Sequence, residues 1–327
     1  MFTFEELQKM VNAEIQQRTT KMISKKPEEL YLPVEYTMEM GGKRLRPVLL
    51  LMAFNLFSDD ITKALPAAVA VEVFHNFTLL HDDIMDKAEM RRNRPTVHKK
   101  FSENSAILSG DVMAFLSYDY LFACQSERIT DVARLFSKTA IEVCEGQQFD
   151  MDFENRFDVS EKEYVEMIRL KTAVLLGCSL KAGALLANAG DHLSSQLYDF
   201  GINLGLAFQL QDDLLDTFGD QHTFGKKIGG DILANKKTYL LIKALELASG
   251  KQLAELKQWL GLNDFNPEQK IDSVKNIYNQ LGIKQLTQDR INTFFQASAT
   301  ILQAINLPQA VKQQLGNLSQ SMLMRDH

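Results

Sequence analysis

Two aspartate clusters with the same pattern lie far apart in this chain. The first occupies residues 82–86 (DDIMD) and the second occupies residues 212–216 (DDLLD). In each cluster the first and last carboxylates are four residues apart, so they share one face of a helix. Both clusters lie in long apolar stretches, where an unpaired charge is costly. If the clusters face each other across a cavity, their oxygen atoms would bind divalent cations, and those cations would bind an anionic substrate.

The helix before the first cluster carries polar residues on one stripe. With the spacing i, i+4, i+7 and i+11, this stripe consists of His75, Leu79, Asp82 and Asp86. On a helix that turns about 100° per residue, these side chains point the same way. A histidine and two carboxylates would then face one cavity. A core histidine beside a polar helix end would give the same pattern, and that alternative stays open at this point.

The second cluster belongs to a similar polar stripe in an otherwise mostly apolar helix. This stripe consists of Gln209, Asp212, Asp213 and Asp216. Its acids would repel one another without a cation, which favours a functional site over a structural network. Carboxylates without His or Cys at metal-ligand spacing indicate magnesium, or manganese, rather than zinc. Magnesium usually combines one or two carboxylates with phosphate oxygens, which indicates a phosphate-bearing substrate.

Basic residues that could bind phosphate directly occur near both clusters. Lys43 and Arg46 stand at a predicted helix start, where the backbone N–H groups also favour anions. Arg91 and Arg92 follow the first cluster, and the arginine fork suits bidentate phosphate contact. Further donors near the second cluster are Lys171, Thr172, Lys226 and Lys236. Each alone could be a surface charge, but together they indicate two anion subsites, one bound through metal and one bound directly.

The elements that must position these residues are predicted to be helices throughout. Strand-like alternation is almost absent, which predicts an all-α fold, and no linker divides the chain, which predicts one domain over residues 1–327. The stretch 173–190 is rich in small residues and predicts a tightly packed helix. Residues 91–95 predict an irregular basic segment. The helices are expected at about 4–23, 28–40, 44–57, 62–87, 104–124, 127–152, 160–189 and 191–217, with shorter ones over 231–325.

Composition excludes several classes of protein. A net charge of −6 without a Lys/Arg run argues against a nucleic-acid binder. The three cysteines have no metal-ligand spacing and are typical of a reducing compartment. The first residues lack the pattern of a signal peptide, and the longest apolar stretch is too short to span a bilayer. We therefore expect a cytoplasmic protein that is not an integral membrane protein.

The motifs, taken together, resemble those of the trans-isoprenyl diphosphate synthases of the short-chain farnesyl or geranylgeranyl type. In chain order they are GGKRLRP, HDDIMD, RRNRPTVH, the pair Lys171-Thr172, FQLQDDLLDTFGD and GKKIGGDILANKKT, over residues 38–240. The resemblance implies an all-α fold of many antiparallel helices around a deep central cavity, and a homodimer. It also implies that isopentenyl diphosphate condenses with an allylic diphosphate (dimethylallyl, geranyl or farnesyl) after magnesium-assisted ionisation.

The same resemblance implies a role for each matched residue. Three magnesium ions would bind Asp82, Asp86 and Asp212, supported by Asp83, Asp213 and Asp216. The allylic diphosphate would contact Arg91, Lys171, Thr172, Gln209, Lys226 and Lys236. Isopentenyl diphosphate would contact Lys43, Arg46, His75 and Arg92. The double lysine at 226–227 leaves open which of its two side chains contacts the diphosphate.

Product length is expected to depend on residues one to two turns before the first cluster. Phe77 and Thr78 lie five and four positions before Asp82 and would line the wall of the tunnel in which the product grows. The resemblance implies that an aromatic residue at position 77, before an uninterrupted DDxxD, gives a C15–C20 product. Alternatively, Phe77 packs in the core and the floor lies near Phe115 or Tyr118.

Other functions would need different motifs. A longer-chain polyprenyl diphosphate synthase remains the alternative within the same chemistry. A terpene cyclase would normally replace the second cluster with an Asn/Ser/Glu-type motif, and a ferritin-like di-metal bundle would need Glu-x-x-His pairs. A non-catalytic subunit of a heteromeric synthase tends to lose one acidic cluster, whereas both are intact here.

Overall fold

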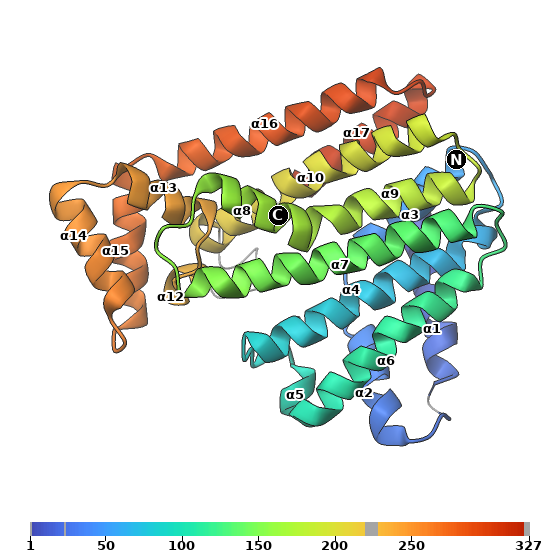
Figure 1. Ribbon diagram of the computed structural model, residues 1–327, viewed down its shortest axis with the longest axis horizontal. Helices are drawn as coiled ribbons and strands as arrows, with labels where there is room; N and C mark the ends of the chain where they lie inside the picture. The colour runs from blue at the N-terminus through green and yellow to red at the C-terminus, as the bar shows by residue number, and fades with distance from the viewer. Residues whose placement is uncertain (1, 23, 220–227, 324–327) are drawn as a thin grey trace. The chain divides into compact units, whose positions relative to one another are not determined.

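Helices form nearly all the regular structure of the protein (Figure 1). A computed structural model describes residues 2–22, 24–219 and 228–323. Within these ranges the only strands are β1 (Met90–Arg91) and β2 (Arg94–Pro95), which pair as a short antiparallel hairpin. The prediction of an all-α fold is confirmed. The basic segment predicted to be irregular contains this hairpin.

Two compact units make up the chain. Unit 1 comprises Met1–Thr139 and Leu175–Tyr198, and unit 2 comprises Ala140–Val174 and Asp199–His327. The long helices α7 (Ile129–Glu154), α9 (Val174–Leu186) and α10 (Asp191–Phe218) contribute residues to both units. The single functional domain predicted over residues 1–327 stays a prediction.

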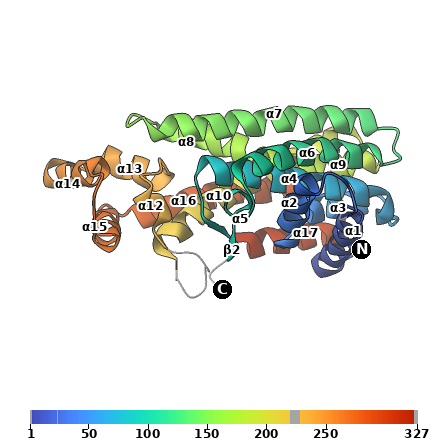
Figure 2. The ribbon, with the colours of Figure 1, turned by 90° about the horizontal axis from the view of Figure 1, so that it is seen from below.

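Unit 1 is built around α4, the helix that carries the first aspartate cluster. Its α4 and α6 run side by side, and α2 packs against α6 (Figure 2). Besides its shares of α7, α9 and α10, its elements are α1 (Phe4–Thr20), α2 (Glu28–Glu39), α3 (Leu45–Asn55), η1 (Ile61–Ala64), α4 (Leu65–Met85), β1, β2, α5 (Val97–Lys100) and α6 (Glu103–Phe122).

Small residues allow α9 to approach α3 closely within unit 1. A Cβ at Gly183 would collide with the backbone oxygen of Leu50. Helix α3 is buried on nearly every side, as expected for a helix that is apolar all round. The tightly packed helix predicted from the small residues of 173–190 is therefore confirmed at this contact.

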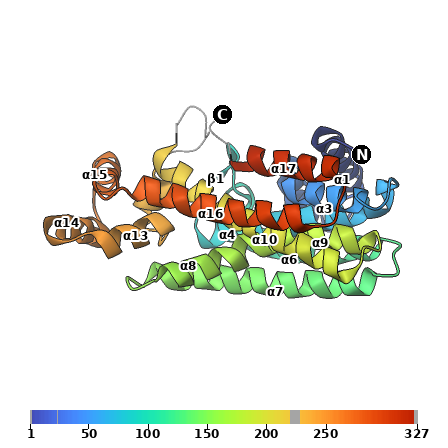
Figure 3. The ribbon, with the colours of Figure 1, turned by 90° about the horizontal axis from the view of Figure 1, so that it is seen from above.

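Unit 2 holds the second aspartate cluster on α10. Helices α13, α14 and α15 lie together in this unit, and α16 contacts α13 and α15 (Figure 3). Besides its shares of α7, α9 and α10, its elements are α8 (Glu161–Ile168), η2 (Arg169–Ala173), α12 (Gly230–Leu233), α13 (Tyr239–Leu247), α14 (Gly250–Gly261), α15 (Pro267–Gln280), α16 (Ile283–Ala304) and α17 (Gln309–Leu323). Among the described residues, we find no helix that combines the length and the apolar character of a membrane span.

The helix predicted over residues 160–189 is not uniformly α-helical. Residues 169–173 form a π-helical turn, η2, between α8 and α9. Here α7 approaches so closely that a Cβ at Gly146 would collide with the backbone of Lys171. π-Helical turns are often found at functional sites. This one carries Lys171 and Thr172, two of the predicted phosphate-binding residues.

Candidate active site

In unit 1 the first aspartate cluster ends α4 and meets the hairpin that follows. The guanidinium of Arg91 lies 2.8 Å from Asp83 and 3.8 Å from Asp82. Burial raises the pKa of Asp83, and the hydrogen bond from Arg91 opposes that rise. Asp86 caps α4 and is exposed. The hairpin therefore brings Arg91 into contact with the cluster, a contact that the sequence order alone does not predict.

The predicted isopentenyl diphosphate residues form a second group in unit 1. A nitrogen of Arg46 lies 3.1 Å from Nε2 of His75. Burial, and then the positive charges headed by Arg46, hold the pKa of His75 well below its usual value, so the ring is neutral. Arg92 donates to the carbonyl oxygen of Gly41. Lys43 is exposed beside this group.

A buried ion pair that the sequence analysis missed supports this group. Arg44 lies 2.6 Å from Glu72, and both side chains are almost fully buried. Arg44 also donates to the carbonyl oxygen of Met38 and to Asn12, and Asn76 donates to Glu72. Arg44 adopts a left-handed backbone conformation with φ 53°. No sequence motif predicts this pair, because Arg44 lies within a basic motif, between the predicted phosphate-binding residues Lys43 and Arg46.

The predicted tunnel residues lie one to two turns before the cluster on α4. The Phe77 ring packs edge-on against Phe74 and His81, with centroid distances of 5.5 and 4.9 Å. The Thr78 hydroxyl donates to the carbonyl oxygen of His75. Of the alternative floor residues, Phe115 is 76% exposed. Tyr118 donates to Ser137.

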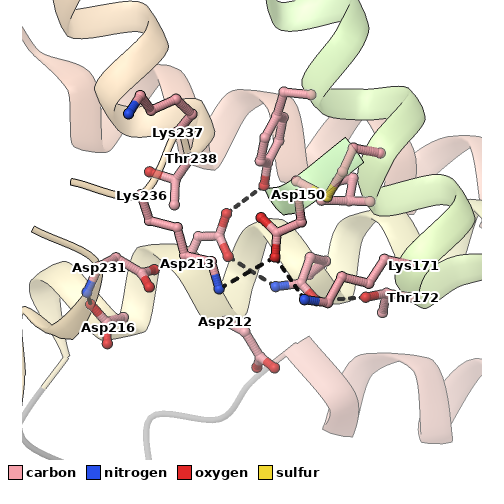
Figure 4. A pocket seen from close by; sticks show the side chains of 14 residues that line it. Asp150, Lys171, Thr172, Asp212, Asp213, Asp216, Asp231, Lys236, Lys237 and Thr238 are labelled. Atoms are coloured by element: carbon pink, nitrogen blue, oxygen red, sulfur yellow. Dashed lines mark hydrogen bonds and ion pairs between the residues drawn. The ribbon is translucent and has the colours of Figure 1, made fainter. Parts of the chain in front are cut away.

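In unit 2 the second aspartate cluster lines a pocket with several predicted phosphate-binding residues (Figure 4). Helix α10, the π-helical turn η2 and the segment before α13 all contribute to this lining. The polar and charged lining residues are Asp150, Tyr164, Lys171, Thr172, Gln209, Asp212, Asp213, Asp216, Asp231, Lys236, Lys237 and Thr238. Lys226, with Lys227, lies outside the described residues.

A chain of hydrogen bonds joins η2 to α10 in this pocket (Figure 4). The Thr172 hydroxyl donates to the Gln209 side chain at 2.9 Å, and Gln209 donates to Asp213 at 2.9 Å. On its other oxygen Asp213 accepts from the hydroxyl of Tyr164. Tyr164 and Asp213 are both buried. The middle aspartate of the cluster is thus fixed by neighbouring helices.

Two of the three lysines that line the pocket contact the same carboxylate. The amine of Lys171 lies 2.7 Å from Asp150, and that of Lys236 lies 3.7 Å from the same oxygen. These two amines lower the pKa of Asp150 although burial opposes them. Asp150 was not identified from the sequence, although it lies on α7 in the polar run 145–154.

Negative charge accumulates on the other side of the same pocket. Burial, and then repulsion from Asp213 and Asp216, raise the pKa of Asp231, and burial raises the pKa of Asp213. The backbone N–H of Asp231 donates to Asp216 at 2.9 Å. Asp231 was not singled out from the sequence, although it lies inside the motif GGDILANKKT.

These carboxylates suit a hard divalent cation. A cation would offset the repulsion that raises the pKa of Asp231, and carboxylate oxygens are the ligands that magnesium prefers. Among the described residues no group of three or more His, Cys, Asp or Glu side chains is placed to hold a metal ion by itself. Magnesium commonly takes its remaining ligands from water and substrate phosphates. Whether the two aspartate clusters converge concerns both units and stays a prediction.

Comparisons with known proteins place these motifs in a family. The family model described as Polyprenyl synthetase matches residues 27–281. Geranylgeranyl diphosphate synthase of Methanosarcina mazei is 44% identical over 223 residues, which cover 68% of this chain and 69% of that protein. Geranylgeranyl pyrophosphate synthase of Geoglobus acetivorans is 36% identical over 98% of this chain and 97% of its own length. A crystal structure of a geranylgeranyl pyrophosphate synthase superposes with a TM-score of 0.94 at 44% identity, covering all of both chains.

Proposed function

The chain belongs to the polyprenyl synthetase family, and we propose that it makes the C20 product geranylgeranyl diphosphate. It is a trans-prenyltransferase that condenses an allylic diphosphate with isopentenyl diphosphate and releases diphosphate. The predicted range was C15–C20, and several relatives are named geranylgeranyl diphosphate synthases. The longer-chain and non-catalytic alternatives are not favoured by these relatives.

One observation in the structure supports this function above all. Within one pocket, two lysines and a Thr–Gln pair stand beside the carboxylates of the second cluster. The lysines and the threonine can donate to phosphate oxygens, whereas the carboxylates can hold a cation that binds the same phosphate. A purely structural network of ion pairs would not need several carboxylates close enough to repel one another, as Asp231, Asp213 and Asp216 are here.

The family uses magnesium, and the pocket fits it. We propose three ions, with Asp82, Asp86 and Asp212 as direct ligands and with Asp83, Asp213 and Asp216 in support. When bound, magnesium neutralises the charge that develops on the leaving diphosphate. Hydrogen bonds from Tyr164 and Gln209 hold Asp213 in place. Through Asp213 they would also orient the face of α10 that carries Asp212 and Asp216.

The allylic diphosphate is assigned to the basic side of the site. Lys171 and Lys236, whose amines both lie near Asp150, would bind the phosphate oxygens of this substrate. Thr172 and Gln209, which are hydrogen-bonded to each other, would orient the diphosphate. Arg91 keeps its predicted role as a contact of the allylic diphosphate. Lys226 keeps its predicted role in this subsite, although it lies outside the described residues.

Isopentenyl diphosphate is assigned to the group in unit 1. Lys43, Arg46 and Arg92 carry the positive charges, and the neutral His75 ring holds Arg46 in place at 3.1 Å. The C–O bond of the allylic diphosphate ionises first, and the double bond of isopentenyl diphosphate then attacks the allylic cation. One proton then leaves the new chain, with the released diphosphate as its acceptor. No nucleophilic side chain is required.

Three further proposals concern the protein as a whole. Phe77 would end the tunnel in which the product grows, with Thr78 beside it. The protein would act as a homodimer. Its cytoplasmic location stays a prediction from composition.

Incubation of the purified protein with isopentenyl diphosphate, dimethylallyl diphosphate and magnesium tests the function. We expect diphosphate release and a C20 product, read by mass spectrometry after dephosphorylation. Isopentenyl diphosphate left unconsumed would refute the transfer, and a product beyond C20 would refute the proposed length. A parallel reaction with an allylic diphosphate alone is the control, because cyclised hydrocarbon there would indicate a terpene cyclase.

A further inference from the structure

A fully buried lysine lies behind the pocket of unit 2. Lys270 on α15 has 0% of its surface exposed. Its amine donates to the carbonyl oxygen of Leu233 at 3.3 Å and to the side-chain oxygen of Asn235 at 2.8 Å. The ring of Phe265 lies 4.0 Å from the same amine. A buried ammonium is costly unless it is hydrogen-bonded, so these groups hold it in one place.

The partners of Lys270 belong to the segment that carries two pocket residues. Leu233 is the last residue of α12, and Asn235 lies between Asp231 and Lys236 in the chain. The backbone N–H of Lys236 donates to the carbonyl oxygen of Asp231 at 2.9 Å, which closes this segment into a loop. Movement of the Leu233–Asn235 backbone would therefore move both pocket side chains.

Two further contacts fix the same loop to the helices behind it. The side chain of Asn235 donates to the carbonyl oxygen of Leu260 on α14 at 3.1 Å. Gly229, with φ 86°, precedes α12, and a Cβ there would come within 2.8 Å of Ile271, the neighbour of Lys270 on α15. The loop backbone thus lies directly on consecutive residues of α15.

We propose that Lys270 is a positioning residue of the transfer site, which holds the loop of residues 229–236 on α15 and so places Asp231 and Lys236 in the pocket. This inference rests on the proposed allylic diphosphate subsite. Lys270 does not line the pocket itself. It acts through the loop, because its amine donates to two oxygen atoms of that loop, the carbonyl oxygen of Leu233 and Oδ1 of Asn235.

The variant Lys270→Met removes the amine and keeps most of the side-chain length. We expect the KM for the allylic diphosphate to rise about tenfold, while the KM for isopentenyl diphosphate stays within about twofold. Hydrogen–deuterium exchange of peptides covering 229–236 should be faster than in the native protein. The matched control is Lys257→Met on α14, which is exposed and should change neither measurement.

A double variant separates positioning from a general loss of packing. If Lys270 acts through the loop, adding Lys270→Met to Lys236→Met should raise the allylic KM little further, because both substitutions then remove the same contribution of Lys236 to binding. Fully additive effects would overturn the proposal. So would an unchanged allylic KM together with unchanged exchange in Lys270→Met.

A second variant covers the case in which Lys270→Met does not fold. Asn235→Ala removes the partner of the amine on the loop and should also raise the allylic KM; a native KM there would overturn the proposal. An assay of the native protein separates a failure of the proposed transfer function from a failure of the positioning role of Lys270. If the native protein forms no product, the proposed transfer function is wrong. If the native protein is active and Lys270→Met keeps the native allylic KM and the native exchange of 229–236, only the positioning role is refuted.

Discussion

The substitution Arg44→Met tests whether a buried ion pair holds the isopentenyl subsite together. Arg44 lies between Lys43 and Arg46 in the sequence, and its guanidinium is bound by Glu72, Asn12 and the carbonyl oxygen of Met38. A methionine would leave the carboxylate of Glu72 buried, with the side-chain amide of Asn76 as its remaining hydrogen-bond donor among the described residues. The same change would release the segment that precedes α3.

The structure sets the size of the expected effect. The two side chains are only 4% and 3% exposed, so this pair is not the weak surface type worth about 1 kcal/mol or less. Removing one partner of a buried pair costs about 3–5 kcal/mol, because the other charge is left without compensation. For a unit of this size, that loss lowers Tm by about 10 °C.

Differential scanning calorimetry of the variant and the native protein measures this loss. Arg134→Met is the control, because Arg134 is exposed and its loss should leave Tm within about 2 °C. The double variant Arg44→Met/Glu72→Met should recover part of the loss, since it removes the uncompensated charge. A native Tm in Arg44→Met, or a double variant less stable than the sum of the single ones, would refute the reasoning.

Three other predictions follow from the site. Phe77→Ala should shift products beyond C20 in the product assay, and unchanged lengths would rule out Phe77 as the limit. The pKa of His75 is lowered in the folded state, so on acidification the unfolded state gains the proton first. Tm should therefore fall as the pH drops below about 6.5. This fall in Tm should be smaller in His75→Gln. If Tm fell with pH as steeply in His75→Gln as in the native protein, His75 would not be the cause of the pH dependence. Tyr164→Phe removes the donor to buried Asp213 and should cost about 2 kcal/mol in urea unfolding, whereas a loss below about 0.5 kcal/mol would show that the bond contributes little.

The local sequence pattern was enough to predict the helices and half of the residues that line the pocket of unit 2. The stripe from Gln209 to Asp216 predicted one polar face on α10, and this face does line a pocket with Lys171, Thr172 and Lys236. Such a prediction succeeds because i, i+3, i+4 and i+7 positions share a face in any helix. The π-helical turn at 169–173 was missed, because it depends on the close approach of α7 at Gly146.

The sequence by itself determined the all-α class, the two aspartate clusters and the family, since these depend on residue type and on spacing along one helix. Only the tertiary structure decided that Asp150 joins Lys171 to Lys236, that Glu72 neutralises Arg44, and that Lys270 supports the loop of Asp231. Each of these contacts joins residues at least 21 positions apart. Their formation depends on burial and on the approach of distant helices, and periodicity within one segment carries no information about either.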